Sequence, residues 1–139
     1  MAQRLAYVTG GMGGIGTAIC QKLHQDGFKV VAGCGPTRDH AKWIAEQKSK
    51  GFTFYASVGN VSDWDSTVEA FKRVKEEHGP VDVLVNNAGI TGRSFPTWEL
   101  EDEDWHRVLA VDLTSVFLCC RAAVRVMLGQ GSGRIVNIA

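Results

Sequence analysis

The sequence has no excess of charge of either sign, because 15 lysines and arginines balance 15 aspartates and glutamates over 139 residues. No segment gathers basic side chains into a stripe, so neither a nucleic acid nor an anionic membrane is an expected partner. Long apolar runs are also absent. The first run, residues 5–8, is too short for a signal peptide, and no other run could span a bilayer. These absences predict a cytoplasmic protein.

The four cysteines give no sign of metal binding. They are Cys20, Cys34, Cys119 and Cys120. Their spacing matches no zinc-binding pattern, and the adjacent pair would point in different directions on a helix. We expect no metal site, and we interpret the cysteines as buried free thiols in a reducing compartment.

Short apolar runs alternate with segments of helical periodicity along the chain. Strands are predicted at residues 5–8, 28–32, 52–56, 81–85 and 134–138. Helices are predicted at residues 17–25, 38–50, 62–78 and from the acidic run 101–104 to about residue 128. This alternation predicts an α/β fold in which helices cover both faces of a parallel sheet. A chain of 139 residues has room for one domain with a core.

The sequence also predicts how individual helices begin and which side chains they bury. Ser62 followed by Asp65 is typical of a capping box at the start of the third helix. Its inner face should carry Val68, Phe71 and Val74. The first helix should turn an apolar face inward, with residues Ile15, Ile19 and Leu23 spaced four apart.

The turn from Thr9 to Gly16, between the first strand and the first helix, is rich in glycine. A strand, a glycine turn and a helix together present free backbone N–H groups and the positive end of a helix to an anion. Gly10 should permit the tight turn, Gly14 should let the backbone approach a pyrophosphate, and Gly16 should let the helix pack closely on the strand. An ATP-type P-loop is excluded because Thr17 stands where that motif needs lysine.

Three further segments combine with the glycine turn into a recognisable order. They are Gly59-Asn60-Val61 after the third strand, Asn86-Asn87-Ala88-Gly89 after the fourth, and Gly133 to Ile138. Together these segments resemble the short-chain dehydrogenase/reductase family, with matching order and spacing over the whole chain. The resemblance implies a Rossmann-type doubly wound parallel sheet with strand order 3-2-1-4-5. It also implies that residues 1–139 form an NAD(P)-binding domain that stops before the remaining strands.

The resemblance assigns cofactor-binding roles by position. The turn of Gly10, Gly11, Met12, Gly13, Gly14, Ile15 and Gly16 would hold the pyrophosphate. Asn60 and Val61, beside Gly59, would line the adenine pocket, with Asn60 standing where many relatives have aspartate. Asn87, Ala88, Gly89, Ile90 and Thr91 would lie along the ribose and nicotinamide. A turn signal after a strand is the alternative interpretation of the asparagine segment, but the carboxyl end of a central strand favours a ligand site.

The choice between NAD and NADP depends on the loop after the second strand. An NAD enzyme needs an acid about twenty residues past the glycine turn, to bond the ribose hydroxyls. This chain has Gly33-Cys34-Gly35 there and then Arg38, which favours NADP(H). Asp39 beside Arg38 and Gly13, where many NADP members carry a basic residue, leave the alternative of NAD open. Arg38 could also be a solvated residue at a helix start.

The chain departs from the family at the positions that carry out catalysis. Hydride transfer in the family depends on a serine after the fifth strand and a Tyr-x-x-x-Lys on the next helix. Tyr7 and Tyr55 are the only tyrosines, and neither has lysine four residues later. A fourth family position, an asparagine in the long helix, aligns with Asp112. Its backbone carbonyl would hold a water of the proton relay, so Asp112 is the one catalytic candidate.

Several stretches, among them Gly-Cys-Gly-Pro at residues 33–36, are similar to bacterial acetoacetyl-CoA reductases. That similarity implies reduction of an acyl-CoA substrate with NADPH in polyhydroxybutyrate synthesis, by a homotetramer. The alternatives are a 3-oxoacyl-[acyl-carrier-protein] reductase of fatty acid synthesis and a non-catalytic dinucleotide-binding protein. Residues 128–131 carry no basic side chain to grip an acidic carrier protein, which favours coenzyme A.

Overall fold

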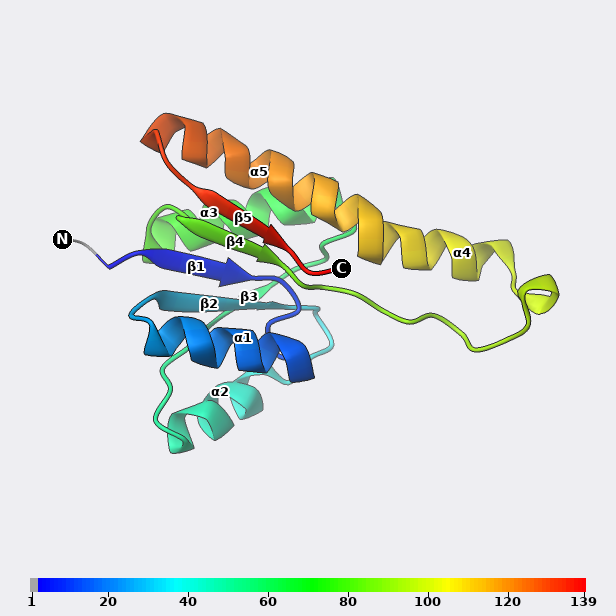
Figure 1. The fold of residues 1–139 in the computed structure, drawn as a ribbon, viewed down its shortest axis with the longest axis horizontal. Coiled ribbons are helices and arrows are strands. Elements are labelled where there is room, and N and C mark those ends of the chain that lie inside the picture. Colours follow the sequence, from blue (N-terminus) through cyan, green and yellow to red (C-terminus); the bar gives the residue numbers. More distant parts are fainter. Residues whose placement is uncertain (1–2) are drawn as a thin grey trace.

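A computed structural model describes residues 3–139 and contains one parallel sheet. Its strands are β1 (Leu5–Val8), β2 (Lys29–Cys34), β3 (Tyr55–Val58), β4 (Val83–Asn86) and β5 (Arg134–Asn137). They lie side by side in the order β3-β2-β1-β4-β5 (Figure 1). The predicted strand order is therefore confirmed. All four neighbouring pairs are parallel, so the carboxyl ends of the strands meet at one edge of the sheet.

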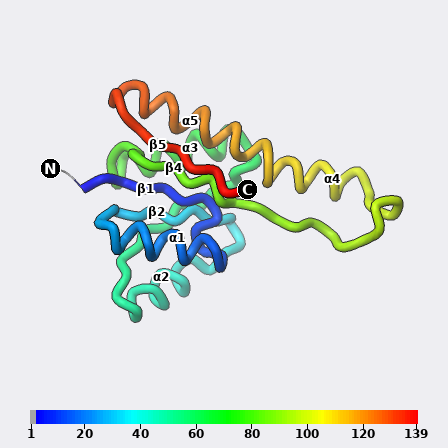
Figure 2. The backbone as a smooth tube through the Cα atoms, in the orientation of Figure 1, coloured from blue at the N-terminus to red at the C-terminus, as the bar shows by residue number. Residues whose placement is uncertain are grey.

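Helices cover both faces of this sheet, as predicted. They are α1 (Gly14–Gln25), α2 (His40–Ser49), α3 (Trp64–His78), α4 (Asp102–Leu109) and α5 (Ser115–Gln130), with a short 3-10 helix at Thr97–Glu99. Figures 1 and 2 show α1 and α2 on one face and α3 and α5 on the other. Each face has its own apolar core, one around Val8, Val30 and Trp43 and the other around Leu84, Phe71 and Ala123.

The third strand begins three residues later than predicted. Phe54 lies before β3 and stacks on Trp43 of α2, with ring centroids 5.2 Å apart. The aromatic run therefore packs against a helix, and pairing with β2 starts only at Tyr55. The apolar character of residues 52–56 correctly located the third strand, but it did not show that the residues before Tyr55 lie outside the sheet.

The second strand runs on through Gly33 and Cys34, because both pair with β3.

Two predicted helix features are wrong. The cap of α3 is Asp63, whose carboxylate accepts a hydrogen bond of 2.8 Å from the backbone N–H of Ser66, so Ser62 and Asp65 form no capping box. Val68 is 40% exposed, whereas Thr67 and Ala70 are buried beside Phe71 and Val74. Phe71 and Val74 are therefore confirmed as inner residues, whereas Val68 is not.

The first helix begins at Gly14 rather than near Thr17, so it takes in the last glycines of the turn. Ile15 consequently lies in the first turn and is 67% exposed, against the prediction that it faces inward. Ile19 and Leu23 are half-buried and pack against the core, as expected.

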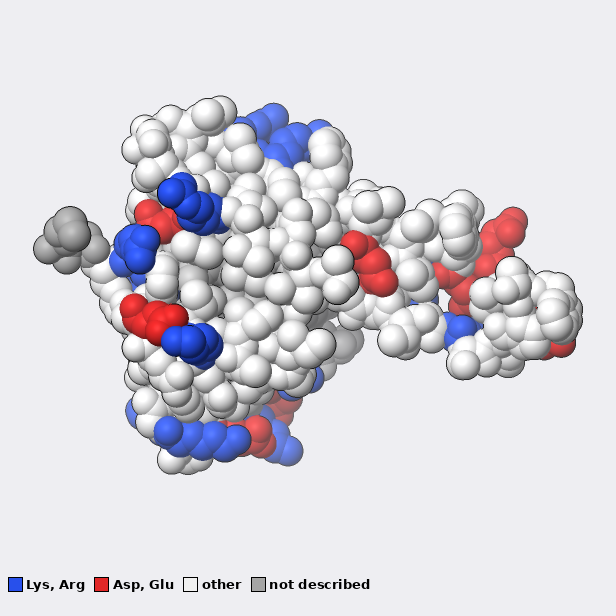
Figure 3. All heavy atoms as spheres, in the orientation of Figure 1, with Lys and Arg blue, Asp and Glu red and all other residues white. Residues whose placement is uncertain are grey.

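The long helix of residues 102–130 is interrupted by a π-helical segment, Ala110–Thr114. The N–H of Ser115 bonds back to the carbonyl of Ala110, five residues earlier, which adds one residue to the turn. Periodicity of apolar residues cannot reveal such an insertion. The part before it, α4, projects away from the sheet, and acidic side chains gather on this projecting part (Figures 1 and 3).

No helix within residues 3–139 is both long and apolar enough to cross a membrane.

Candidate functional site

The hydroxyl of Thr9 joins the glycine turn to the loop after β4. Its Oγ1 accepts hydrogen bonds from the backbone N–H groups of Asn87, at 3.0 Å, and Ala88, at 3.1 Å. The side-chain amide of Asn87 donates to the carbonyl of Gly10 at 3.0 Å. Thr9 is 2% exposed, so these bonds hold two neighbouring strand ends together in the protein interior. Sequence reasoning missed Thr9 as a site residue, although its place at the end of a buried strand was visible.

Glycine is required at two points of the turn for different reasons. Gly10 has a φ of +58°, in the left-handed region that side chains disfavour. A Cβ on Gly16 would collide with the carbonyl oxygen of Gly10. Close packing at Gly16 was predicted, but it is with the turn itself rather than with the strand.

The amino end of α1 is open. Its first flanking residue is Gly13, which has no side chain to cap the free N–H groups. Gly13, Gly14 and Ile15 are exposed, and a Cβ on Gly14 would meet nothing within 4 Å. Uncapped N–H groups and the positive end of the helix dipole fit an anion such as a pyrophosphate. The side chain of Met12, in contrast, is buried in the core and can present only its backbone to a ligand.

Arg38 lies against the glycine turn although it belongs to the loop after β2. Its Nη2 donates a hydrogen bond of 2.6 Å to the carbonyl oxygen of Met12. Asp39 is occupied as the cap of α2, where it accepts from the N–H of Lys42 at 3.1 Å. A guanidinium has five N–H donors, so Arg38 can hold the turn and still offer donors to an anion.

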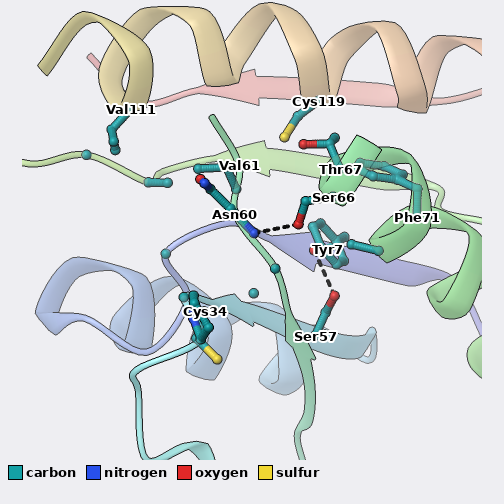
Figure 4. A pocket seen from close by; sticks show the side chains of 18 of the residues that line it. Tyr7, Cys34, Ser57, Asn60, Val61, Ser66, Thr67, Phe71, Val111 and Cys119 are labelled. Carbon is teal, nitrogen blue, oxygen red and sulfur yellow. Dashed lines mark hydrogen bonds between the residues drawn. The ribbon is translucent and has the colours of Figure 1, made fainter. Parts of the chain in front are cut away.

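A cavity of about 290 Å³ opens beside the turn at the carboxyl ends of the strands. Among the expected cofactor residues it is lined by Gly10, Gly35, Gly59, Asn60, Val61, Ala88, Gly89 and Ile90. The expected residues outside its lining are Gly11, Met12, Gly13, Gly14, Ile15, Gly16, Arg38, Asn87 and Thr91. Figure 4 shows side chains that sequence reasoning missed, including Tyr7, Cys34, Ser57 and Ser66.

Two of these missed side chains form a buried polar pair at the cavity. The hydroxyl of Tyr7 bonds to Oγ of Ser57 at 2.9 Å (Figure 4). Burial raises the pKa of Tyr7 to about 12, so its phenol stays protonated at neutral pH. Cys34 stays a thiol for the same reason, since burial raises its pKa while nearby Arg38 opposes that rise. Neither group is prepared to exchange protons.

The carboxylate of Asp112 ties the π segment to the loop after β4. Its Oδ1 accepts a hydrogen bond of 2.7 Å from the N–H of Ile90, and the adjacent Val111 lines the cavity. The aligned position was predicted to matter through its backbone carbonyl, so the side-chain contact was not foreseen. Within residues 3–139 no three His, Cys, Asp or Glu side chains gather as a metal site would require.

The sequence profile described as short chain dehydrogenase matches residues 4–139. The chain belongs to the short-chain dehydrogenase family. The acetoacetyl-CoA reductase of Cupriavidus necator is 56% identical over 100% of this chain and 56% of its own length. A 3-oxoacyl-[acyl-carrier-protein] reductase of Staphylococcus epidermidis is 37% identical over 96% of this chain and 54% of its own.

A solved structure of an actinorhodin polyketide ketoreductase variant with NADPH superposes with a TM-score of 0.91 and 35% identity. The match covers 99% of this chain and 53% of that one. The chain thus spans about half the length of the relatives it matches. The family and the NADPH named for this solved structure indicate a nicotinamide dinucleotide cofactor.

Gly14 and Gly16, in the first turn of α1, should respond differently to an added methyl group. We expect Gly16→Ala to lower stability by about 1–3 kcal/mol, because its Cβ collides with backbone. Gly14→Ala should leave stability within about 0.5 kcal/mol, because its Cβ meets open space. Thermal unfolding of both variants measures the difference, and equal melting temperatures would contradict it.

Proposed function

We propose that residues 1–139 are the N-terminal, NADP-binding part of an acetoacetyl-CoA reductase. The enzyme would reduce a 3-oxoacyl-CoA to the (R)-3-hydroxyacyl-CoA with NADPH, for polyhydroxybutyrate synthesis in the cytoplasm. The observation that carries the activity is the 56% identity to such a reductase over the whole chain. The open end of α1 beside the strand-end cavity supports the cofactor assignment.

Different residues of the site would bind different parts of the cofactor. The turn from Gly10 to Gly16 would hold the pyrophosphate through backbone N–H groups, and Arg38 would bind the 2′-phosphate. Asn60 and Val61 would line the base pocket, and residues 87–91 would lie along the ribose and nicotinamide. When bound, NADPH supplies the hydride. The present residues contribute binding and orientation, and Asp112 would hold a proton-relay water through its backbone carbonyl.

The groups that move protons to substrate would lie outside these 139 residues. The chain has no Tyr-x-x-x-Lys, and its two tyrosines are Tyr7, which is buried and protonated, and Tyr55. An apolar groove of about 660 Å³ between α1 and strands β4 and β5, lined by Ile15, Val85 and Val136 among others, supports further chain packing there. Figure 3 shows no charged side chains over the middle of this face.

A 3-oxoacyl-[acyl-carrier-protein] reductase is the second candidate, favoured by the 37% identity to one. An acidic carrier protein is best held by basic residues. The last turn of α5 carries none, which supports coenzyme A as the carrier.

The activity can be tested by comparing residues 1–139 with the full-length enzyme. The fragment should oxidise no measurable NADPH with acetoacetyl-CoA, because loss of positioned acid–base catalysis alone costs about 10²–10⁴-fold in rate. The full-length enzyme should turn over, and faster with acetoacetyl-CoA than with the same acyl group on acyl carrier protein. Loss of nicotinamide absorbance is the measurement. Turnover by the fragment would show that a proton-transfer group lies within it.

Arg38→Ala should separate the two cofactors in the full-length enzyme. Loss of a charged contact to the 2′-phosphate should weaken NADPH binding about tenfold to a hundredfold and leave NADH nearly unchanged. Arg73→Ala is a matched control, since Arg73 is also exposed and donates to a backbone carbonyl, that of Val58. Equal weakening of both cofactors by Arg38→Ala would mean that Arg38 only supports the turn.

The outer side of the long helix supports assembly as a homotetramer. Its exposed apolar residues include Leu113, Phe117 and Leu128, which are 64%, 59% and 76% exposed. Such exposure on one helix is typical of a subunit contact. Sedimentation of the full-length enzyme at micromolar concentration should give a tetramer, and Phe117→Glu should shift it toward smaller species. A monomer before substitution would contradict the assembly.

A further inference from the structure

Two side-chain hydrogen bonds join α2 to α1, the two helices on one face of the sheet (Figure 1). In the first turn of each helix, the indole Nε1 of Trp43 donates to Oγ1 of Thr17 at 3.0 Å. One turn farther along both helices, Nε2 of Gln21 donates to Oε1 of Gln47 at 2.8 Å. Trp43 is 4% exposed, and an indole N–H can only donate. Thr17 therefore supplies the acceptor that this buried donor requires.

Trp43 is connected to Arg38 by a short hydrogen-bonded segment. Asp39, directly after Arg38, caps α2 by accepting from the backbone N–H of Lys42 at 3.1 Å. The backbone N–H of Trp43 in turn donates to the carbonyl of Asp39 at 3.4 Å. Only this capped first turn of α2 separates Arg38 from Trp43. A shift of Trp43 relative to α1 therefore moves Arg38 as well.

Arg38 also contacts the glycine turn directly, but that contact alone does not fix its position. Its Nη2 donates to the carbonyl oxygen of Met12 at 2.6 Å, while the residue itself is exposed in the loop before α2. A guanidinium binds phosphate best through two parallel N–H donors, so its position matters as well as its charge. One bond at the tip of a long side chain does not hold the backbone of Arg38. The bond between Trp43 and Thr17 holds that backbone relative to α1.

We propose that Thr17 is a positioning residue for cofactor selectivity. By accepting the hydrogen bond of Trp43, it sets the place at which Arg38 meets the 2′-phosphate, and thereby the preference for NADPH over NADH. This inference rests on the proposed function, because it takes Arg38 as the ligand of that phosphate. Thr17 acts only through Arg38. Its contribution is therefore made with NADPH and not with NADH, which has no 2′-phosphate for Arg38 to bind.

The experiment measures the dissociation constants of NADPH and NADH for variants of the full-length enzyme by calorimetry. Thr17→Val keeps the branched shape of the side chain and removes the acceptor. It should weaken NADPH about fivefold, the size expected for one neutral hydrogen bond, and leave NADH within about twofold. Thr17→Ser is the matched control, because it keeps the hydroxyl, and it should bind both cofactors as the unsubstituted enzyme does. Trp43→Phe removes the donor instead and should reproduce the effect of Thr17→Val.

A double-mutant cycle separates positioning from a general loss of stability. In an Arg38→Ala background, Thr17→Val should weaken NADPH no further, because the residue through which it acts is gone. If Thr17→Val does not fold, Trp43→Phe takes its place in the same cycle. Unchanged NADPH binding, equal weakening of both cofactors, or a loss that persists without Arg38 would overturn the inference. Equal weakening of both cofactors by Arg38→Ala alone would instead overturn the assignment of the 2′-phosphate in the proposed function.

Discussion

The site depends on hydrogen bonds between two neighbouring strand ends. Parallel strands leave their last N–H groups without partners at the carboxyl edge, and buried N–H groups must be satisfied. Thr9 takes two of them, from Asn87 and Ala88, and Asn87 returns a bond to the carbonyl of Gly10. The glycine turn and the loop after β4 are thereby fixed relative to each other. A ligand that spans both meets a surface already in place, so its binding carries little cost of ordering.

Electrostatics at this edge come from the backbone more than from side chains. The open end of α1 provides partial positive charge without any cationic residue in the turn. Arg38 adds a full positive charge beside the turn, and it is anchored through the carbonyl of Met12. The acidic neighbour Asp39 is bound to α2 instead. Backbone donors and a guanidinium suit a ligand that carries phosphate groups.

The long helix both packs on the sheet and contacts the loop after β4, and the π segment Ala110–Thr114 allows it to do both. Its α5 half packs on the sheet through Leu118, Cys119 and Ala123. The π segment then shifts the register, which directs Val111 to the cavity and Asp112 to the N–H of Ile90. In an uninterrupted helix these two side chains would point in other directions relative to α5, since one inserted residue rotates the helix face by about 100°. The loop after β4 is thus held by Thr9 on one side and by Asp112 on the other.

The sequence by itself determined the class of fold, the strand order and the glycine turn. The class of fold and the glycine turn follow from local patterns, namely apolar runs of strand length, helical spacing and clustered glycines, whereas the strand order came from the resemblance to a family. The tertiary structure decided which apolar residues are inside, as Val68, Ile15 and Phe54 illustrate, because burial depends on the partner that each face meets. It also decided the contacts of Arg38, Asp112 and Trp43. Hydrogen bonds such as those join residues that lie far apart in the chain or depend on one rotamer, and no spacing along a sequence encodes them.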